Sequence, residues 1–222
     1  MADQKRPYRK KRRAELEART RRRITESMVE LHRTLGPART SISAVAERAG
    51  VRRSTVYRHF PNEAALFAAC TSHWTALNPP PNLAGWAMIE DPEERLGSAL
   101  EELYAYYRGT EAMMENLHRD EATMPIVKRL LGGFREYISA ARETLMSGRR
   151  ARGRVRQRVR AAIGLALAFE TWRSLVREQG LDDPQAAELM YRLVAAAAHG
   201  SDSASGPTPR SKQRAAASGA ER

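Results

Sequence analysis

The spacing of apolar residues along the chain predicts helices and no sheet. Between positions 20 and 35 they recur at the interval of one helical face, as Ile24, Met28, Leu31 and Leu35. Shorter helices are predicted at about 42–49 and 52–58, and Asn62 is placed to cap a fourth helix. Further helices are predicted at about 92–108, 110–118, 124–147, 152–179 and 184–199. No segment alternates apolar and polar residues between turn residues, so we expect an all-α fold.

Breaks in this pattern divide the chain into parts. Three successive prolines at 79–81 cannot continue a helix, which predicts a Pro-rich linker over 76–91. Residues 1–19 are too charged to bury a face, and 200–222 have few apolar residues, so both segments are expected to be disordered, with a helix as the alternative for the later half of the first. Two helical domains remain, a small one at 20–75 and a larger one at 92–199.

The positive charge is concentrated at one end of the chain. The net charge is +12, and residues 1–23 carry eleven Lys and Arg against three acidic residues. Residues 24–73 have six against four, whereas residues 74–200 have seventeen of each. Such a distribution favours a basic head that meets a polyanion, usually nucleic acid, on a neutral body.

Other compositional features exclude several classes of protein. Cys70 is the only cysteine, so no intramolecular disulfide can form. No apolar run approaches the length that spans a bilayer, and residues 1–23 lack the apolar core of a secretory signal. We therefore expect a cytoplasmic protein that does not enter a membrane.

The helices predicted at 42–49 and 52–58 have the spacing of a helix-turn-helix. This motif needs a small residue where the helices cross, a turn residue with backbone freedom, and a buried apolar residue in the second helix. Ala46, Gly50 and Val56 meet these needs in that order, and Phe60 closes the small core. The spacing alone is weak, but here it follows an amphipathic helix in the basic part of the chain.

Polar residues on the other faces of the second helix are suited to DNA. An arginine can donate two hydrogen bonds to a guanine edge, and hydroxyl groups suit phosphates or base edges. The predicted DNA-contacting residues are Thr40, Ser41, Arg52, Arg53, Ser54, Thr55, Tyr57, Arg58 and His59. The alternative is that the arginines only keep a short helix solvated.

The stretch from position 40 to 67, TSISAVAERAGVRRSTVYRHFPNEAALF, resembles the N-terminal domain of the TetR family of transcriptional regulators. The matching positions are Ala46, Gly50, Tyr57, His59, Phe60, Pro61, Asn62 and Leu66. The resemblance implies that Arg53 and Ser54 face bases. It also implies phosphate contacts from Tyr57 and His59, and a backbone anchor at Thr40 or Ser41.

The sequence departs from the family pattern in two respects. Glu63 and Ala64 stand where a phosphate-contacting lysine often opens the fourth helix. Arg52 stands where serine or threonine commonly caps the recognition helix, which weakens the cap and adds a charge.

The two last predicted helices have broad apolar faces. The resemblance implies a second domain that holds an effector pocket and forms a homodimer, and two such helices from each copy would make a four-helix bundle. The residues expected at this interface are Ile163, Ala166, Phe169, Leu189, Leu193 and Ala197. The alternative is that these faces are buried within their own domain.

Aromatic and methionine residues of the linker and the second domain, together with one leucine, are candidates for an effector pocket. They are Trp86, Tyr104, Tyr107, Met113, Met114, Leu117, Phe134, Tyr137 and Trp172. Together they suit a lipophilic or aromatic ligand, which Asn116 and His118 could orient, although each residue alone is also typical of a core. An effector that prefers a conformer with separated heads would lower DNA affinity.

Two arginine-rich segments have two interpretations each. The segment 1–19 is either a solvated tail or an arm that adds phosphate or minor-groove contacts. The segment 149–160, with seven arginines in twelve residues, is either a solvated helix start or a second nucleic-acid site.

The sequence offers little support for an enzyme. It has no nucleophile-elbow, P-loop or dinucleotide-binding motif, and its five histidines never pair at metal-ligand spacing, so no metal or cofactor is expected. The sequence therefore predicts a DNA-binding transcriptional regulator, a repressor released by a small, largely apolar effector. The alternatives are an architectural DNA-binding protein without ligand control and a regulator that has lost its effector response.

Overall fold

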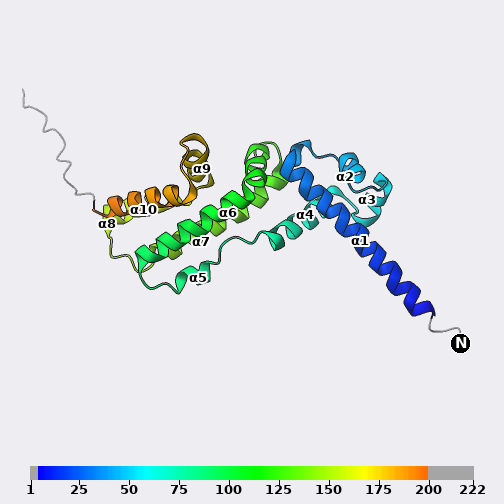
Figure 1. The fold of residues 1–222 in the computed structure, drawn as a ribbon, viewed down its shortest axis with the longest axis horizontal. Helices are drawn as coiled ribbons and strands as arrows, with labels where there is room; N and C mark the ends of the chain where they lie inside the picture. Colours follow the sequence, from blue (N-terminus) through cyan, green and yellow to red (C-terminus); the bar gives the residue numbers. More distant parts are fainter. Residues whose placement is uncertain (1–4, 200–222) are drawn as a thin grey trace, which may run out of the picture.

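The computed structural model describes residues 5–199, and within that range it contains only helices, which confirms the all-α class (Figure 1). The first part consists of α1 (Lys5–Thr34), the 3-10 turn η1 (Pro37–Arg39), α2 (Ile42–Arg48), α3 (Arg53–His59) and α4 (Glu63–Leu77). The second part consists of α5 (Leu83–Ala87), α6 (Pro92–Asp120), α7 (Pro125–Met146), α8 (Gly153–Ala166), α9 (Phe169–Arg173), the π-helical turn η2 (Ser174–Glu178) and α10 (Asp183–His199). The predicted tail at 200–222 lies outside the described residues.

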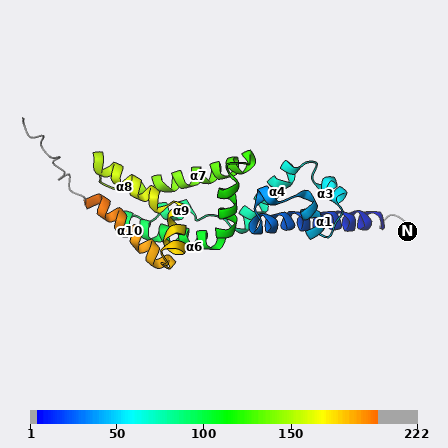
Figure 2. The ribbon, with the colours of Figure 1, turned by 90° about the horizontal axis from the view of Figure 1, so that it is seen from above.

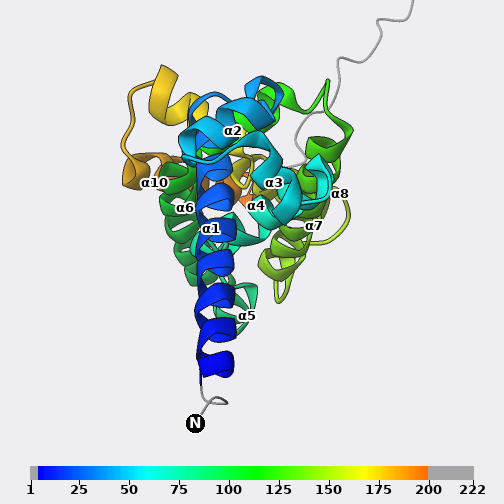
Figure 3. The same cartoon turned by 90° about the vertical axis from the view of Figure 1, so that its right-hand side faces the viewer.

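The molecule is elongated, with a small head at one end. Helices α1 to α4 form this head, and α5 to α10 form the body, with α8 and α10 at the end farthest from α1 (Figures 1 and 2). Viewed along the long axis, α2 and α3 lie beside α1, which projects beyond them (Figure 3). The head therefore presents both a short helix pair and the free end of a long basic helix.

The ends of the head helices are set by local hydrogen bonds. The side chain of Ser41 accepts a hydrogen bond from the Ala44 N–H at 3.1 Å and caps α2, and Asn62 caps α4 in the same way through the Ala65 N–H at 2.8 Å. Gly50, between α2 and α3, has a φ of 61°, a conformation that side chains with a Cβ rarely adopt. The turn between α2 and α3 therefore needs a residue that tolerates positive φ, and glycine was predicted at this position.

The N-terminal segment differs from the expectation of a disordered arm. Helix α1 begins at Lys5, so residues 5–19 are helical, and only residues 1–4 of that predicted arm lie outside the described range. Arg13 pairs with Glu17 at 3.0 Å one turn away, and the Thr20 hydroxyl donates to the Leu16 carbonyl at 2.9 Å. Such pairs, and a run of residues with high helix propensity, stabilise the solvent-exposed continuation of α1 beyond its packed part.

The predicted linker at 76–91 also differs, because part of it is folded. Helix α4 continues to Leu77, and α5 lies within the segment with its Trp86 side chain buried. The Trp86 indole Nε1 donates a hydrogen bond to Glu102 of α6 at 2.9 Å. The residues around the three prolines and those at 88–91 are not helical, but the buried Trp86 between them makes the segment a packed connection rather than a free linker.

Two predicted helix boundaries in the body are corrected. Residues 92–120 form one helix rather than two, since Gly109 does not interrupt α6. The single helix predicted over 152–179 is broken after Ala166, where the carbonyls of Ala166 and Leu167 accept hydrogen bonds from the buried hydroxyls of Tyr104 and Tyr107 at 2.9 and 2.6 Å. These hydroxyls satisfy helix-end carbonyls, which lets the chain turn into α9.

Candidate DNA interface and ligand cavity

One face of helix α3 is packed against the rest of the head. Val56 and Phe60 are each 1% exposed, and Ala46 at the crossing with α2 is 4% exposed. Because these residues face inward, the other faces of α3 meet solvent. The predicted DNA-contacting residues Arg52, Arg53, Ser54, Tyr57 and Arg58 are exposed, and Thr55 and His59 are half-buried.

Arg53 and Tyr57 occupy neighbouring turns of this outer face. The Arg53 Nη2 donates to the Tyr57 hydroxyl at 3.3 Å, and its guanidinium carbon lies 5.6 Å from the centre of the tyrosine ring. This contact holds a cation and a hydroxyl side by side on the exposed face, a combination that suits a guanine edge and an adjacent phosphate. Arg52 precedes the helix without capping it, as its residue type implies.

The residues predicted at the start of α2 have local bonds of their own. The Thr40 hydroxyl donates to the Gly36 carbonyl at 2.8 Å, and the Ser41 oxygen is the cap of α2. Both residues lie at the N-terminus of α2, whose free N–H groups favour an anion.

His59 joins the end of α3 to α1. Its backbone carbonyl accepts a hydrogen bond from Arg21 of α1 at 2.6 Å, and the same guanidinium lies 4.1 Å from the Phe60 ring centre. Burial lowers the pKa of the His59 imidazole, and the charges of Arg58 and Arg21 lower it further. In the free protein these effects favour the neutral imidazole, and its Nε2 is buried without a hydrogen-bond partner among the described residues.

The comparisons with known proteins agree with this geometry. Residues 24–70 match the sequence model of the family described as bacterial regulatory proteins, tetR family. The chain carries a TetR-family DNA-binding domain. No curated protein sequence matches the chain.

Solved structures extend the likeness to the fold of the TetR-family body. A TetR-like transcriptional regulator from Rhodococcus sp. RHA1 is 19% identical with a TM-score of 0.61, covering 82% of this chain and 97% of that chain. A TetR-family regulator from Streptomyces coelicolor is 20% identical with a TM-score of 0.54, covering 82% and 80%. A TetR transcription regulator from Haloarcula marismortui is 14% identical with a TM-score of 0.53, covering 82% and 97%. The family match therefore covers the N-terminal domain, and the solved structures show that most of the chain shares the fold of these TetR-family regulators.

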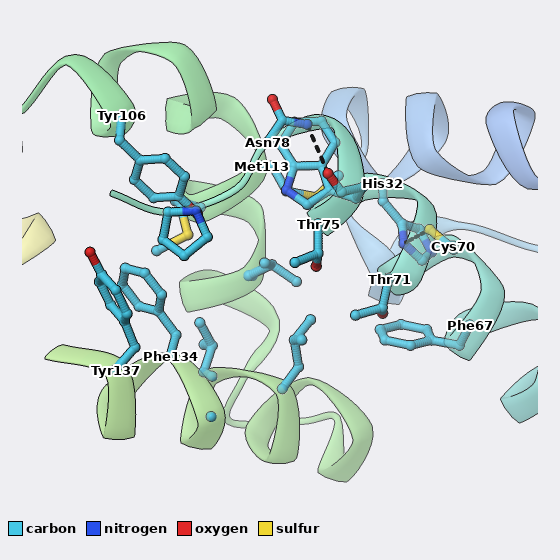
Figure 4. A pocket seen from close by; sticks show the side chains of 17 residues that line it. His32, Phe67, Cys70, Thr71, Thr75, Asn78, Tyr106, Met113, Phe134 and Tyr137 are labelled. Carbon is cyan, nitrogen blue, oxygen red and sulfur yellow. Dashed lines mark hydrogen bonds between the residues drawn. The ribbon is translucent and has the colours of Figure 1, made fainter. Parts of the chain in front are cut away.

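A cavity of about 270 Å³ lies where the TetR-family head meets the body (Figure 4). Helix α4 contributes Thr71, Trp74 and Thr75 to its wall, its C-cap residue Asn78 adds an amide, and α1 contributes His32. At the far end, the rings of Phe134 and Tyr137 stack at 5.7 Å, and Tyr106 stacks on Phe134 at 6.2 Å. Apolar side chains make up most of the remaining wall: Phe67, Met113, Met114, Leu117, Leu130 and Leu131.

The structure brings some of the predicted pocket residues to this cavity and places others elsewhere. Met113, Met114, Leu117, Phe134 and Tyr137 line it. Four do not: Trp86, Tyr104, Tyr107 and Trp172. The indole Nε1 of Trp172 donates to Asp183 at 2.9 Å, while the two tyrosine hydroxyls hold the α8–α9 turn and Trp86 packs α5 on α6. These four are core residues, which was the alternative interpretation of each pocket candidate in the sequence.

The contribution of the head to the cavity was missed. Residues 67, 70, 71, 74 and 78 recur at i, i+3, i+4, i+7 and i+11, which marks a second face of α4. That spacing is visible in the sequence, but only the fold shows that this face looks into the body. Asn116 and His118 also take other roles: Asn116 bonds to the backbone of α1, and His118 pairs with Glu170 at 3.0 Å.

The cavity has no charged wall at neutral pH. None of the described residues that line it is Asp, Glu, Lys or Arg. Burial lowers the pKa of His32 to about 4 against a small opposing effect of Asp120, and burial raises the pKa of the Cys70 thiol to about 12. The His32 Nδ1 and Cys70 Sγ, 3.6 Å apart, are therefore both neutral, and polar contacts come from hydroxyl and amide groups.

Helix α6 holds the segment that joins α1 to α2. The Asn116 Nδ2 donates to the carbonyls of His32 and Arg33 at 3.0 and 2.8 Å. Arg119 donates to the Leu35 carbonyl at 2.8 Å, and Asp120 accepts from the Ala38 N–H at 2.9 Å. We call Asn116, Arg119 and Asp120 the α6 clasp. Although burial opposes it, these hydrogen bonds and Arg119 lower the pKa of Asp120, which stays ionised.

The predicted dimer residues separate into two groups. Ile163, Ala166 and Phe169 are buried inside the protomer, because the body packs over that face of α8 and α9, so they are not free to form an interface. On α10, Leu189 and Leu193 are 44% and 39% exposed, and Ala197 is half-buried. Leu165 of α8, which is 51% exposed, lies with them on the packed α8–α10 pair.

The arginine-rich segment 149–160 lies at the opposite end of the molecule from α3 (Figure 1). Arg149 donates to Glu93 at 2.6 Å and to the Pro92 carbonyl, and Arg160 pairs with Glu143. Within residues 5–199, no helix is both long and apolar enough to cross a membrane, and no cluster of three metal-ligating side chains occurs.

Proposed function

We propose that this protein is a cytoplasmic, homodimeric repressor that binds a near-palindromic operator and is released by a small, neutral, largely apolar effector. The observation that carries the proposal is the cavity between head and body, walled by α1 and α4 on one side and by α6 and α7 on the other. Transcriptional regulators of this family are not enzymes, and we propose no catalytic role.

The chemistry of the cavity wall supports the ligand class. A charged ligand would lose its hydration and find no counter-ion, which costs several kcal/mol. A flat aromatic ligand would instead stack on the rings of Tyr106, Phe134 and Tyr137. Its polar edge would meet Thr71 and Thr75 on α4 (Figure 4).

Shared wall residues support coupling between ligand and DNA. His32 and Phe67, whose rings lie 5.2 Å apart, line both the main cavity and a smaller one of about 180 Å³ that also borders Thr40 and Ser41. A ligand that moves these two rings would therefore move the start of α2. The change in DNA affinity equals the ratio of the ligand's affinities for the two conformers.

The exposed leucines of α8 and α10 support the homodimer. Leu165 on α8 and Leu189 and Leu193 on α10 are exposed leucines on two helices that pack together, and a second copy would cover them in a four-helix bundle. Two-fold symmetry would present two α3 helices about one turn of DNA apart, near 34–36 Å.

DNA binding is tested by fluorescence anisotropy on duplexes that tile the DNA upstream of the protein's own gene, at about 150 mM salt. We expect one near-palindromic duplex to bind hundreds of fold more tightly than its scrambled control. Arg53→Ala should weaken that complex by about tenfold or more, because it removes a base contact, whereas Arg154→Ala in the body should not. Equal binding of the wild type to every duplex would refute the proposal.

The effector class is tested with two probes of one shape. Isothermal titration calorimetry should show 2-naphthol binding at least about tenfold more tightly than naphthalene-2-sulfonate, since only the sulfonate brings a charge into the cavity. Phe134→Ala should weaken 2-naphthol binding, and Tyr8→Ala on the exposed arm is the control. Tighter binding of the sulfonate would contradict a neutral ligand.

A further inference from the structure

The first half of α1 projects from the head with its described side chains in solvent. From Tyr8 to Arg19, every side chain that the structure describes is exposed, so this part of the helix is not held by a core. It spans 5–19 and is about 22 Å long at the rise of an α-helix. We call it the basic extension.

Most of the cations in this region have no partner within the described part of the chain. Arg13 and Arg22 pair with acidic side chains one turn away, at 3.0 and 2.9 Å. No ion pair or side-chain hydrogen bond within residues 5–199 involves Lys10, Lys11, Arg12, Arg19 or Arg23. Five unpaired cations on one helix repel one another, a cost that a polyanion would remove.

The position of the extension relative to α3 decides which polyanion it meets. Arg21 binds the His59 carbonyl and packs on Phe60, so the base of the extension is fixed at the C-terminal end of the recognition helix. From there the helix projects beyond α2 and α3 (Figure 3). A duplex docked on α3 would continue past this point, with its phosphates beside the extension.

The pattern of apolar residues argues against a membrane surface. An interfacial helix needs a continuous apolar face. Between positions 8 and 19 the only large apolar side chains are Tyr8 and Leu16, two turns apart, with charged residues between them. The extension has charge all round and no stripe to bury in lipid.

We propose that the basic extension is a second DNA-binding surface, which contacts the phosphate backbone flanking the operator without reading its sequence. The proposal rests on the proposed function of α3 in binding DNA. At about 3.4 Å per base pair, a 22 Å helix reaches up to about six base pairs beyond the recognition helix on each side.

The test compares two triple variants that lose the same charge. In the first, Lys10→Gln, Lys11→Gln and Arg12→Gln neutralise the extension and keep good helix formers. In the second, Arg152→Gln, Arg154→Gln and Arg156→Gln neutralise exposed residues at the far end of the body. Both are titrated between about 50 and 300 mM salt on an operator duplex with full flanks and on one trimmed by about six base pairs at each end.

We expect the extension variant to bind the full duplex about 10- to 100-fold more weakly at 150 mM salt. The slope of log K against log salt should be shallower by up to about 5.4, since the dimer would lose six phosphate contacts, three in each subunit. On the trimmed duplex the wild type and this variant should converge. The body variant should match the wild type throughout.

Equal affinities and slopes for the two triple variants would overturn the proposal, as would an extension variant equally weakened on both duplexes. A loss confined to phosphatidylserine-containing vesicles, with DNA binding unchanged, would also overturn it in favour of a membrane surface. Failure of the α3 proposal gives a different result, since the wild type would then not distinguish operator from scrambled duplex.

Discussion

Gly36 lies at the centre of the contact between head and body. It follows α1 with a φ of 93° and a ψ of 159°, a region of backbone conformation that is open to glycine almost alone. A Cβ at this position would lie 1.9 Å from the Arg119 Nη2 and 2.7 Å from an Asp120 carboxylate oxygen. Gly36→Ala would therefore strain the backbone and displace the α6 clasp together.

The loss of stability in Gly36→Ala follows from the backbone strain and from the displaced Arg119. An unfavourable φ and ψ costs about 1–3 kcal/mol. Arg119 is flexible and its side chain is 42% exposed, so it can move away, but it then loses its bond to the Leu35 carbonyl, worth about 1 kcal/mol. We expect Gly36→Ala to lower the free energy of unfolding by about 2–4 kcal/mol.

The measurement is urea unfolding followed by circular dichroism, at one fixed protein concentration because a dimer dissociates as it unfolds. Gly109→Ala is the matched control. Gly109 lies within α6, and a Cβ added there would meet no atom of the described residues within 4 Å, so the change should stabilise the helix by about 0.5–1 kcal/mol. A Gly36→Ala protein within about 0.5 kcal/mol of the wild type would refute the account of the clasp.

Two further predictions concern pH and assembly. Because burial lowers the pKa of His32 from 6.5 to about 4, protonation favours the unfolded chain, so stability is lost as pH falls below 6.5; between pH 7 and 5 the loss from this group is about 2 kcal/mol. Urea titrations of His32→Phe should show a correspondingly weaker dependence on pH, and an unchanged dependence would contradict the burial effect. Leu189→Glu with Leu193→Glu should give monomers by sedimentation, whereas the control Glu188→Gln should not; an intact dimer would place the interface elsewhere.

The head was predictable from sequence because its chemistry is local. Ala46, Gly50 and Val56 form the motif within eleven residues, and the caps Ser41 and Asn62 act on N–H groups three residues away. The exposed face of α3 follows directly once Val56 is buried. The boundaries of α2 and α3 were predicted to within a residue or two for the same reason.

The body was predicted less well because its decisive contacts are distant in sequence. The break after Ala166 depends on Tyr104 and Tyr107, about sixty residues earlier, and neither hydroxyl has a local signature. The cavity needs α4 and α7 to face each other, so Trp74 and Phe134 could not be assigned to one wall from spacing alone. An apolar stripe such as that of Ile163 and Phe169 shows that a face is buried, but it does not show whether the same protomer or a second copy covers it.

The continuity of α1 has a mechanical consequence. Its thirty residues form a rod about 45 Å long, held near its C-terminal end where Asn116 binds the carbonyls of His32 and Arg33. If that end is a pivot, a tilt of about 5° moves Arg21 by about 1.4 Å and the start of the rod by about 3.5 Å, from the rise per residue alone. A displacement at the cavity wall too small to reorganise the core would thus be amplified by leverage along α1, and most of the motion would arrive at the end that carries the charge.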